Sequence, residues 1–174
     1  ATATDLNVGN VKAAIDKIAN TYKIPDKNLI HVSVNGGSDT PNSYETVDDL
    51  GTDYHPYGTI QAAIDRVVSN GDNSTSNPYT LFIYPGEYPE NLNLNYSQLV
   101  DIRFFGFPGV DVKPSSGDAL NCTSNNDQLV VLDVHDVRFD GPINIAGAVD
   151  GGSTLSNLGS FYNGLFNDIT AKNC

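Results

Sequence analysis

Apolar residues at the start of the chain follow the spacing of one face of a helix. In DLNVGNVKAAIDKIANTYKIP (5–25) they recur three and four residues apart, which predicts an amphipathic helix within residues 1–24 that ends before Pro25. Its apolar positions are Val8, Val11, Ile15, Ile18 and Tyr22. β-branched residues in such a repeat are typical of trimeric coiled coils, so we expect a homotrimer joined by this seam. The alternative is a single helix packed on its own domain.

Two more segments with a clear pattern follow. LIHVSV (29–34) alternates apolar and polar residues and predicts a strand, and the polar stretch 35–57 predicts a loop. YGTIQAAIDRVVSNG (57–71) predicts a short helix, with Thr59 as its N-cap and Gly71 at its end. The apolar face of this helix comprises Ile60, Ala63, Ile64, Val67 and Val68.

The rest of the chain has the pattern of short strands separated by corners. YTLFIY (79–84) predicts a buried strand, and YPGEYPENLNL (84–94) predicts a corner followed at once by another strand. Leu92 and Leu94 are expected to point inward. Asn91, Asn93 and Asn95 are then outward, where asparagines of successive strands can form a ladder.

An internal repeat indicates stacked units. DIRFFGFPGVDV (101–112) resembles DVRFDGPINI (136–145), and the two begin 35 residues apart. Stacked units of this kind bury an apolar face only against their neighbours, which predicts a β-solenoid. With one coil per 35 residues, Asp101 is expected beside Asp136 and Arg103 beside Arg138.

The segment YGTIQAAIDRV followed by LFIYPGEYPENLNL resembles the opening of the pectin-lyase-like right-handed parallel β-helix proteins, the pectinesterase-like group especially. Phage tailspikes and other polysaccharide lyases have a similar start. The likeness covers residues 55–112 and includes a strand that ends in Pro-Gly-x-Tyr-x-Glu, here Pro85 to Glu90. It implies an all-β solenoid, a right-handed parallel β-helix capped by a short amphipathic helix, with a separate N-terminal helix. The family's Asp-Phe-Ile-Phe-Gly and Gln-Asp-Thr motifs are absent, so no catalytic residue is carried over.

These patterns divide the chain into three parts: the helix of residues 1–24, a strand and loop connection of residues 25–56, and a helix-capped β-helix of residues 57–174. The formal net charge of −12 argues against nucleic acids and anionic membranes as partners. The two cysteines, Cys122 and Cys174, lack the spacing of a zinc site, and we expect neither a metal nor a cofactor. No signal-peptide pattern is visible, and we expect the protein on a virion surface or outside cells.

The strongest candidate chemistry lies in LVVLDVHDVRF (129–139). Alternation places Asp133 and His135 outward, and an irregularity at His135-Asp136 must then reset the pattern so that Arg138 is outward and its apolar neighbours are inward. With Arg103, these residues are candidates for contact with a glycan or a partner. The expected stack of Asp101 on Asp136, beside Arg103 and Arg138, would pair carboxylates with a cation for acid–base work on a sugar. The alternative is a checkerboard of solvated surface charges.

A second candidate group lies in TDYHPYGT (52–59), where Tyr54, His55 and Tyr57 provide aromatic rings that can stack on sugars. The alternative is ordinary packing in a loop.

Three functions remain open. The first is a non-catalytic structural or attachment protein of a virion, either a homotrimeric capsid decoration protein or the base of a tail spike, in contact with other virion proteins or a surface polysaccharide. The second is the N-terminal part of a polysaccharide-active enzyme, which the acidic charge disfavours because a polyanionic substrate is normally bound by Arg and Lys. The third is a glycan-binding module.

Overall fold

In the residues that the structure describes, the protein is predominantly β-structure with one α-helix. The computed structural model describes residues 28–43, 46–74, 76–94, 100–123, 130–146, 161–162 and 166–172. The predicted helix of residues 1–24, with its trimer seam, lies outside this range. The elements are β1 (Leu29–Val32), α2 (Ile60–Asn70), β2 (Tyr79–Ile83), β3 (Gly86–Tyr88), β4 (Leu92–Asn93), β5 (Val100–Val112), β6 (Leu120–Thr123), β7 (Val130–Ala146), β8 (Phe161–Tyr162) and β9 (Phe166–Lys172).

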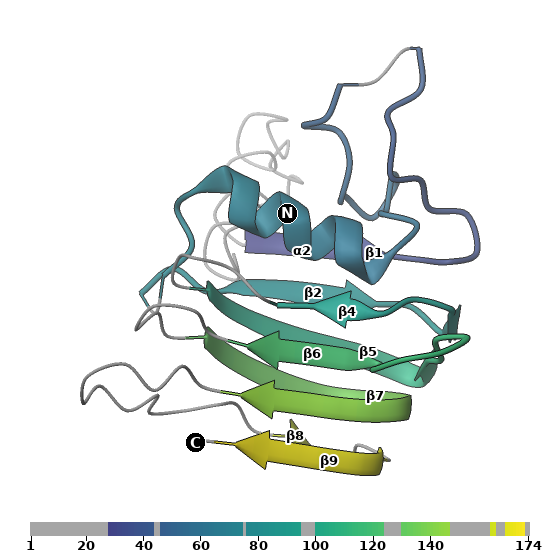
Figure 1. Cartoon of the computed structure of the whole chain (residues 1–174). Helices are drawn as coiled ribbons and strands as arrows, with labels where there is room; N and C mark the ends of the chain where they lie inside the picture. The colour runs from purple at the N-terminus through teal and green to yellow at the C-terminus, as the bar shows by residue number, and fades with distance from the viewer. Residues whose placement is uncertain are drawn as a thin grey trace, which may run out of the picture.

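All named strands belong to one curled parallel sheet. Its main path is β1-β2-β5-β7-β6-β4, and β3 pairs with β5 while β8 and β9 pair with β7. The long strands β5 and β7 bend, so different parts of each strand pair with different short strands. Figure 1 shows the result as strands stacked from α2 at one end to β9 at the other.

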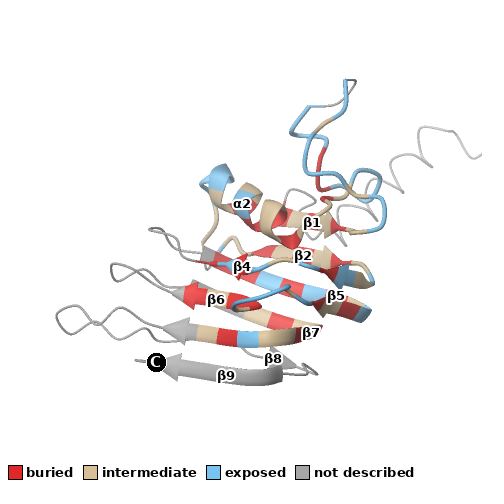
Figure 2. Cartoon of the chain, turned by 45° about the vertical axis from the view of Figure 1, so that its right-hand side comes forward, coloured by how far each residue is buried: buried red, intermediate tan, exposed pale blue. Residues whose placement is uncertain are grey.

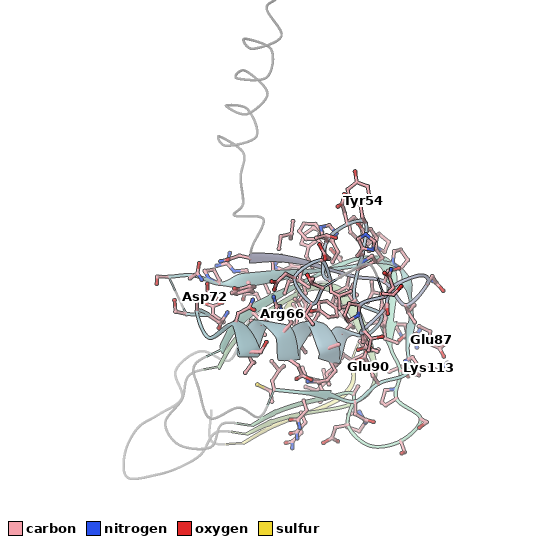
Figure 3. All side chains as sticks on the ribbon, turned by 90° about the horizontal axis from the view of Figure 1, so that it is seen from above. Tyr54, Arg66, Asp72, Glu87, Glu90 and Lys113 are labelled. Atoms are coloured by element: carbon pink, nitrogen blue, oxygen red, sulfur yellow. The ribbon has the colours of Figure 1, made fainter. Side chains whose placement is uncertain are left out.

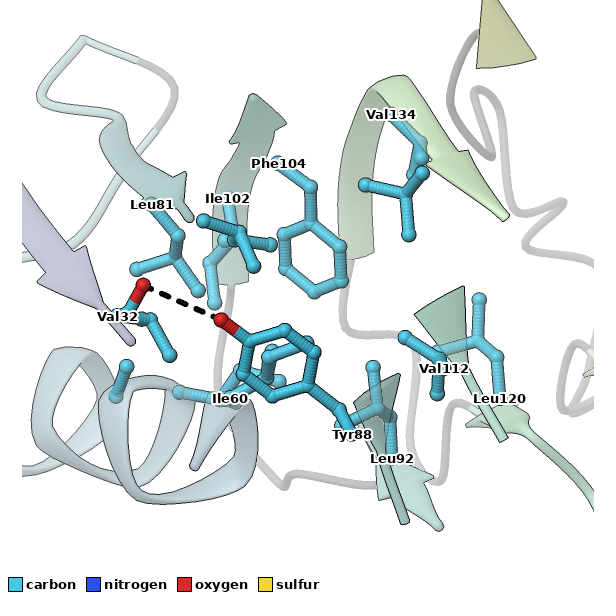
Figure 4. Packing of buried hydrophobic residues seen from close by; sticks show 14 of the residues in the cluster. Val32, Ile60, Leu81, Tyr88, Leu92, Ile102, Phe104, Val112, Leu120 and Val134 are labelled. Carbon is cyan, nitrogen blue, oxygen red and sulfur yellow. Dashed lines mark hydrogen bonds between the residues drawn. The ribbon is translucent and has the colours of Figure 1, made fainter. Parts of the chain in front are cut away.

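The core lies inside this curl. Apolar side chains from successive strands point inward and form one cluster, which includes Leu81, Ile102, Leu92 and Leu120. Figure 4 shows these side chains converging from strands on different sides of the curl. Burial alternates along β2 in the sequence Tyr79 to Ile83, as the period of a strand requires. In Figure 2 the buried residues follow the strands and the inner side of α2.

Helix α2 covers the end of the stack and confirms its prediction. The Thr59 side chain accepts a hydrogen bond from the Ala62 N–H, and Gly71 ends the helix in the left-handed conformation with φ 72°. Ile60, Ala63, Ile64 and Val67 are buried. The helix packs against β1, β2 and β4.

Two distant carboxylates complete the N-terminus of α2. Glu90 accepts hydrogen bonds from the Ile60 N–H at 2.8 Å and the Gln61 N–H at 2.9 Å. Asp39 accepts them from the Gly58 and Thr59 N–H groups at 2.8 and 3.0 Å. The first N–H groups of a helix have no intrahelical partner and favour negative charge, so both contacts fix the helix on the sheet.

The Pro-Gly-x-Tyr-x-Glu corner is structural. Tyr88 is fully buried, and its hydroxyl donates to the Tyr84 carbonyl at 2.8 Å while it accepts from the Val34 N–H at 3.3 Å. Figure 4 marks its further contact with the Val32 carbonyl. Leu92 and Leu94 are buried and Asn91 and Asn93 are exposed, as predicted. This corner therefore ties β1, the helix and the first turn of the sheet together.

The predicted stacking of the two repeats is wrong. Asp101 pairs with Val131 rather than Asp136, and Arg103 pairs with Asp133 rather than Arg138. The coil between β5 and β7 is 30 residues at this point, since 131 minus 101 is 30. The register keeps buried Phe104 beside buried Val134, and the corner of β5 is longer than that of β7. The internal repeat of residues 101–112 and 136–145 therefore marks two similar corners, but these corners do not lie side by side in the sheet.

Candidate functional site

The outer side of the sheet carries a row of aromatic rings. The register pairs His31 of β1 with Phe82 of β2, Phe82 with Phe105 of β5, and Phe105 with His135 of β7. His31 and Phe82 each lie between two buried neighbours, and Phe105 and His135 each follow a buried residue, so the alternation of the strands places all four side chains on the outer face. We call His31, Phe82, Phe105 and His135 the aromatic row. One ring per strand thus runs across four neighbouring strands.

The rings of the row touch one another. Ring centroids are 5.8 Å apart for His31 and Phe82, 5.3 Å for Phe82 and Phe105, and 6.1 Å for Phe105 and His135. These separations fall in the range of favourable aromatic pairs. The row is therefore a continuous line of aromatic rings in contact across the four strands.

Two further rings widen the row where β2 and β5 turn. Tyr84 and Phe107 stack on each other with centroids 5.4 Å apart and an angle of 8° between the rings. Phe107 also touches Phe82 at 6.0 Å, and the Tyr84 hydroxyl lies 3.1 Å from Nδ1 of His31. We call the aromatic row together with Tyr84 and Phe107 the aromatic patch. This patch has an apolar centre and a polar edge.

Burial shapes the chemistry of this patch. Phe105 is 41% exposed, while the other rings are half-buried. Burial is the largest influence on His31 and lowers the pKa of its imidazole, and the charge of Asp53 opposes this effect. His31 therefore favours its neutral form, in which it can accept or donate a hydrogen bond at the edge of the patch.

Charged side chains lie beside the row in opposite-sign pairs. Arg103 approaches Asp133 at 4.0 Å. Farther along the same two strands, beyond the corner, Arg138 of β7 lies 3.5 Å from Asp111 of β5 and 3.6 Å from Asp140. These side chains are partly exposed, so each pair contributes only about 0–1 kcal/mol. The candidates Arg103 and Asp133 are thus brought together near His135, and Arg138 belongs to a separate cluster.

Among the side chains of this face that the structure describes, Asp101 is the one buried carboxylate, at 4% exposure. Burial is the largest influence and raises the pKa of this group, while the charge of Arg103 lowers it. Its backbone is held by Asn73, whose side chain accepts from the Asp101 N–H and donates to the Asp101 carbonyl. Asp101 and Asp133 interact, but Val131 rather than a carboxylate lies opposite Asp101 in the ladder.

Of the three candidates in the 52–59 loop, Tyr54 and His55 share one cavity and Tyr57 lies apart from them. Tyr54 is 82% exposed and projects away from the sheet, as Figure 3 shows. With His55 it lines a cavity of about 180 Å³ formed by residues of the loop. Tyr57 is only 5% exposed and pairs with Val32 in the core. Its ring is therefore not presented at the surface.

Five rings of the patch were not predicted as site residues from the sequence: His31, Phe82, Tyr84, Phe105 and Phe107. The signal was present as adjacent apolar residues, Phe82 inside TLFIY and Phe105 beside Phe104. A strand has two faces, so an unbroken apolar run places some of its side chains outward. An outward aromatic residue in each of several successive strands is the pattern that indicates such a patch.

Neither a metal centre nor a membrane segment is evident in the part of the chain that the structure describes. No group of three or more His, Cys, Asp or Glu side chains there is arranged to hold a metal ion. No helix within the same residues has the length and apolar character needed to cross a bilayer. A search of protein-family models, curated proteins and solved structures finds no match to this chain.

Proposed function

We propose that this chain forms the first coils of a right-handed parallel β-helix and acts as a non-catalytic attachment module on a virion surface. The single observation that carries the attachment role is the aromatic row. Apolar and aromatic surface with a few polar groups at its edge is the usual composition of a binding site, and exposed aromatic patches mark interaction surfaces.

The arrangement of charges supports a binding role over an enzymatic one. Glycoside chemistry uses a pair of carboxylates across the scissile bond. On this face Arg103 and Arg138 form ion pairs with Asp133 and Asp111, so these two carboxylates are matched with guanidinium groups. The parallel register and the α2 cap support the continuation of the curled sheet into a β-helix.

The trimeric assembly and the virion location are proposed from the sequence. The seam from Val8 to Tyr22 has the spacing of a coiled coil. A three-chain assembly would also protect the edges of an open sheet, which otherwise invite aggregation. The resemblance to the start of tail-spike β-helices supplies the location.

Light scattering of the 174-residue chain at several concentrations tests this proposal. A trimeric mass independent of concentration is expected, and Ile15→Asp should dissociate it. Asn20→Asp adds the same charge outside the seam and should leave the mass unchanged. A monomeric wild-type chain would contradict the trimer. Release of reducing ends from a bound polysaccharide would contradict the non-catalytic role.

A further inference from the structure

The aromatic row offers flat apolar rings and few charges to a ligand. Building on the proposed attachment role, we infer that the row binds an uncharged glycan chain that lies across the strands, with its sugar rings stacked on Phe82 and Phe105. These two rings are in contact at 5.3 Å, and Phe105 is 41% exposed. The patch is thus both continuous and accessible at its centre.

The polarity of the patch matches that of a sugar. A pyranose has an apolar C–H face and a rim of hydroxyl groups. The rings of the row supply apolar faces, and the Tyr84 hydroxyl and the His31 imidazole lie at the edge, 3.1 Å apart. Both can exchange hydrogen bonds with hydroxyl groups. This combination orients a neutral ligand without a charged contact.

The charges of the protein exclude an acidic glycan as the preferred ligand. The net charge of −12 repels polyanions. Arg103, Arg138 and Lys113, the cations whose side chains the structure describes on the sheet, lie within 4.0 Å of carboxylates. In Figure 3 Lys113 and Glu87 are seen side by side, at 3.1 Å. An acidic sugar would have to displace one of these partners.

Charge also disfavours a second copy of this chain as the occupant. Two copies each carry −12, and they would have to bring like-charged sheet faces together. A cationic ligand would gain from the net charge, but the row itself consists of Phe and His side chains. An uncharged glycan is not repelled by the net charge of the protein, and it needs no charged side chain in the row.

Isothermal calorimetry of the 174-residue chain tests this inference. The probes are uncharged glucose and N-acetylglucosamine oligosaccharides of increasing length, with polygalacturonate and chitosan oligosaccharides for comparison. We expect affinity for an uncharged probe to rise with its length and to change little with salt. Phe105→Leu, which keeps the apolar bulk and removes the flat ring, should weaken binding about tenfold. Tyr54→Leu removes a ring that is 82% exposed and outside the row, and should not change it.

Several results would overturn the inference. The chain could bind polygalacturonate or chitosan more tightly than the uncharged probes, or bind no glycan at all. Alternatively, Phe105→Leu could leave the affinity for the uncharged probe unchanged, or Tyr54→Leu could lower that affinity as much as Phe105→Leu does. A chain that binds polygalacturonate without cleaving it would remain an attachment module. If an uncharged probe binds in a way that depends on Phe105 and is also cleaved, the non-catalytic role is contradicted but the inference about the glycan stands. If no glycan binds and Phe105→Asp lowers the mass measured by light scattering, a second copy occupies the row.

Discussion

Gly106 lies against the backbone of Asp136, the residue at which the next coil turns its corner. A Cβ atom at Gly106 would be 2.6 Å from the Asp136 carbonyl oxygen and 2.9 Å from Cγ2 of Val137. Asp136 itself has φ 54°, a conformation that non-glycine residues adopt rarely. The two corners are therefore in backbone contact, and that contact admits no side chain on β5.

Gly106→Ala should consequently destabilise the protein by about 2–4 kcal/mol, because backbone atoms rather than a flexible side chain must move. Gly141, the counterpart of Gly106 in the sequence repeat, provides the control. Its added Cβ would meet the Ala119 Cβ at 3.2 Å and the Pro114 Cγ at 3.3 Å, so Gly141→Ala should cost less. Urea unfolding followed by circular dichroism measures both. An equal cost would contradict the difference between the corners.

Tyr88→Phe should lower the free energy of unfolding by about 1–3 kcal/mol, because it leaves buried backbone groups without their partner. The hydroxyl bonds the Tyr84 carbonyl and the Val34 N–H, and burial raises its pKa to about 12, so it remains a donor at neutral pH. Tyr54→Phe, at an exposed position, should be neutral. Thermal unfolding of the two variants distinguishes these outcomes, and a neutral Tyr88→Phe would show that the corner does not depend on the hydroxyl.

Glu90→Ala should destabilise the protein by about 1–2 kcal/mol at neutral pH, since the Ile60 and Gln61 N–H groups lose their acceptor. Asp65→Ala on the same helix is a suitable comparison, because it removes a carboxylate that does not cap the helix N-terminus and lies at an exposed site. Its effect should be smaller. Equal losses of stability, measured by urea unfolding, would argue against the cap.

The stability of the protein should depend on the protonation of Glu90. Burial is the largest influence and raises the pKa of this carboxyl, against the lowering effect of its two backbone hydrogen bonds. The folded state thus binds the proton more tightly than the unfolded chain. This contribution is complete below the ordinary glutamate pKa of about 4.3 and is lost as pH rises through the raised value.

Glu90→Gln removes that titration. Relative to this variant, the wild-type free energy of unfolding should therefore fall as pH rises through the window above about pH 4.3. Urea titrations at a series of pH values measure the difference between the two proteins. A difference that stays constant, or that grows with pH, would contradict the raised pKa.

Local elements of the fold were predictable from the sequence because each depends on neighbouring residues. The apolar spacing of Ile60 to Val67, with Thr59 before it and Gly71 after it, specified helix α2 and both of its caps. The break in alternation at His135-Asp136 predicted a reset of the inward pattern, and the structure has Val134, Val137 and Phe139 buried on either side of Asp136. The inward and outward sides of residues 91–94 followed from alternation alone.

The candidate site was predictable only in part. His135, Asp133 and Arg103 were named from the sequence, and the register brings them together near the end of the aromatic row. Tyr57 was named with them and is buried in the core. The rings of Phe82 and Phe105 were not predicted, because the pattern along one strand does not show which residues of other strands lie beside it.

The sequence by itself determined which side of each strand faces the core, since the period of a strand is two residues and the pattern is local. Only the tertiary structure decided which residues of different strands lie side by side. A shift of two residues preserves the alternation equally well, and the lengths of the intervening corners select among the registers. In the structure Arg103 pairs with Asp133 and Phe105 with His135, and because residues 106–109 of β5 lie opposite Asp136 alone, the register has shifted where Val110 pairs with Val137.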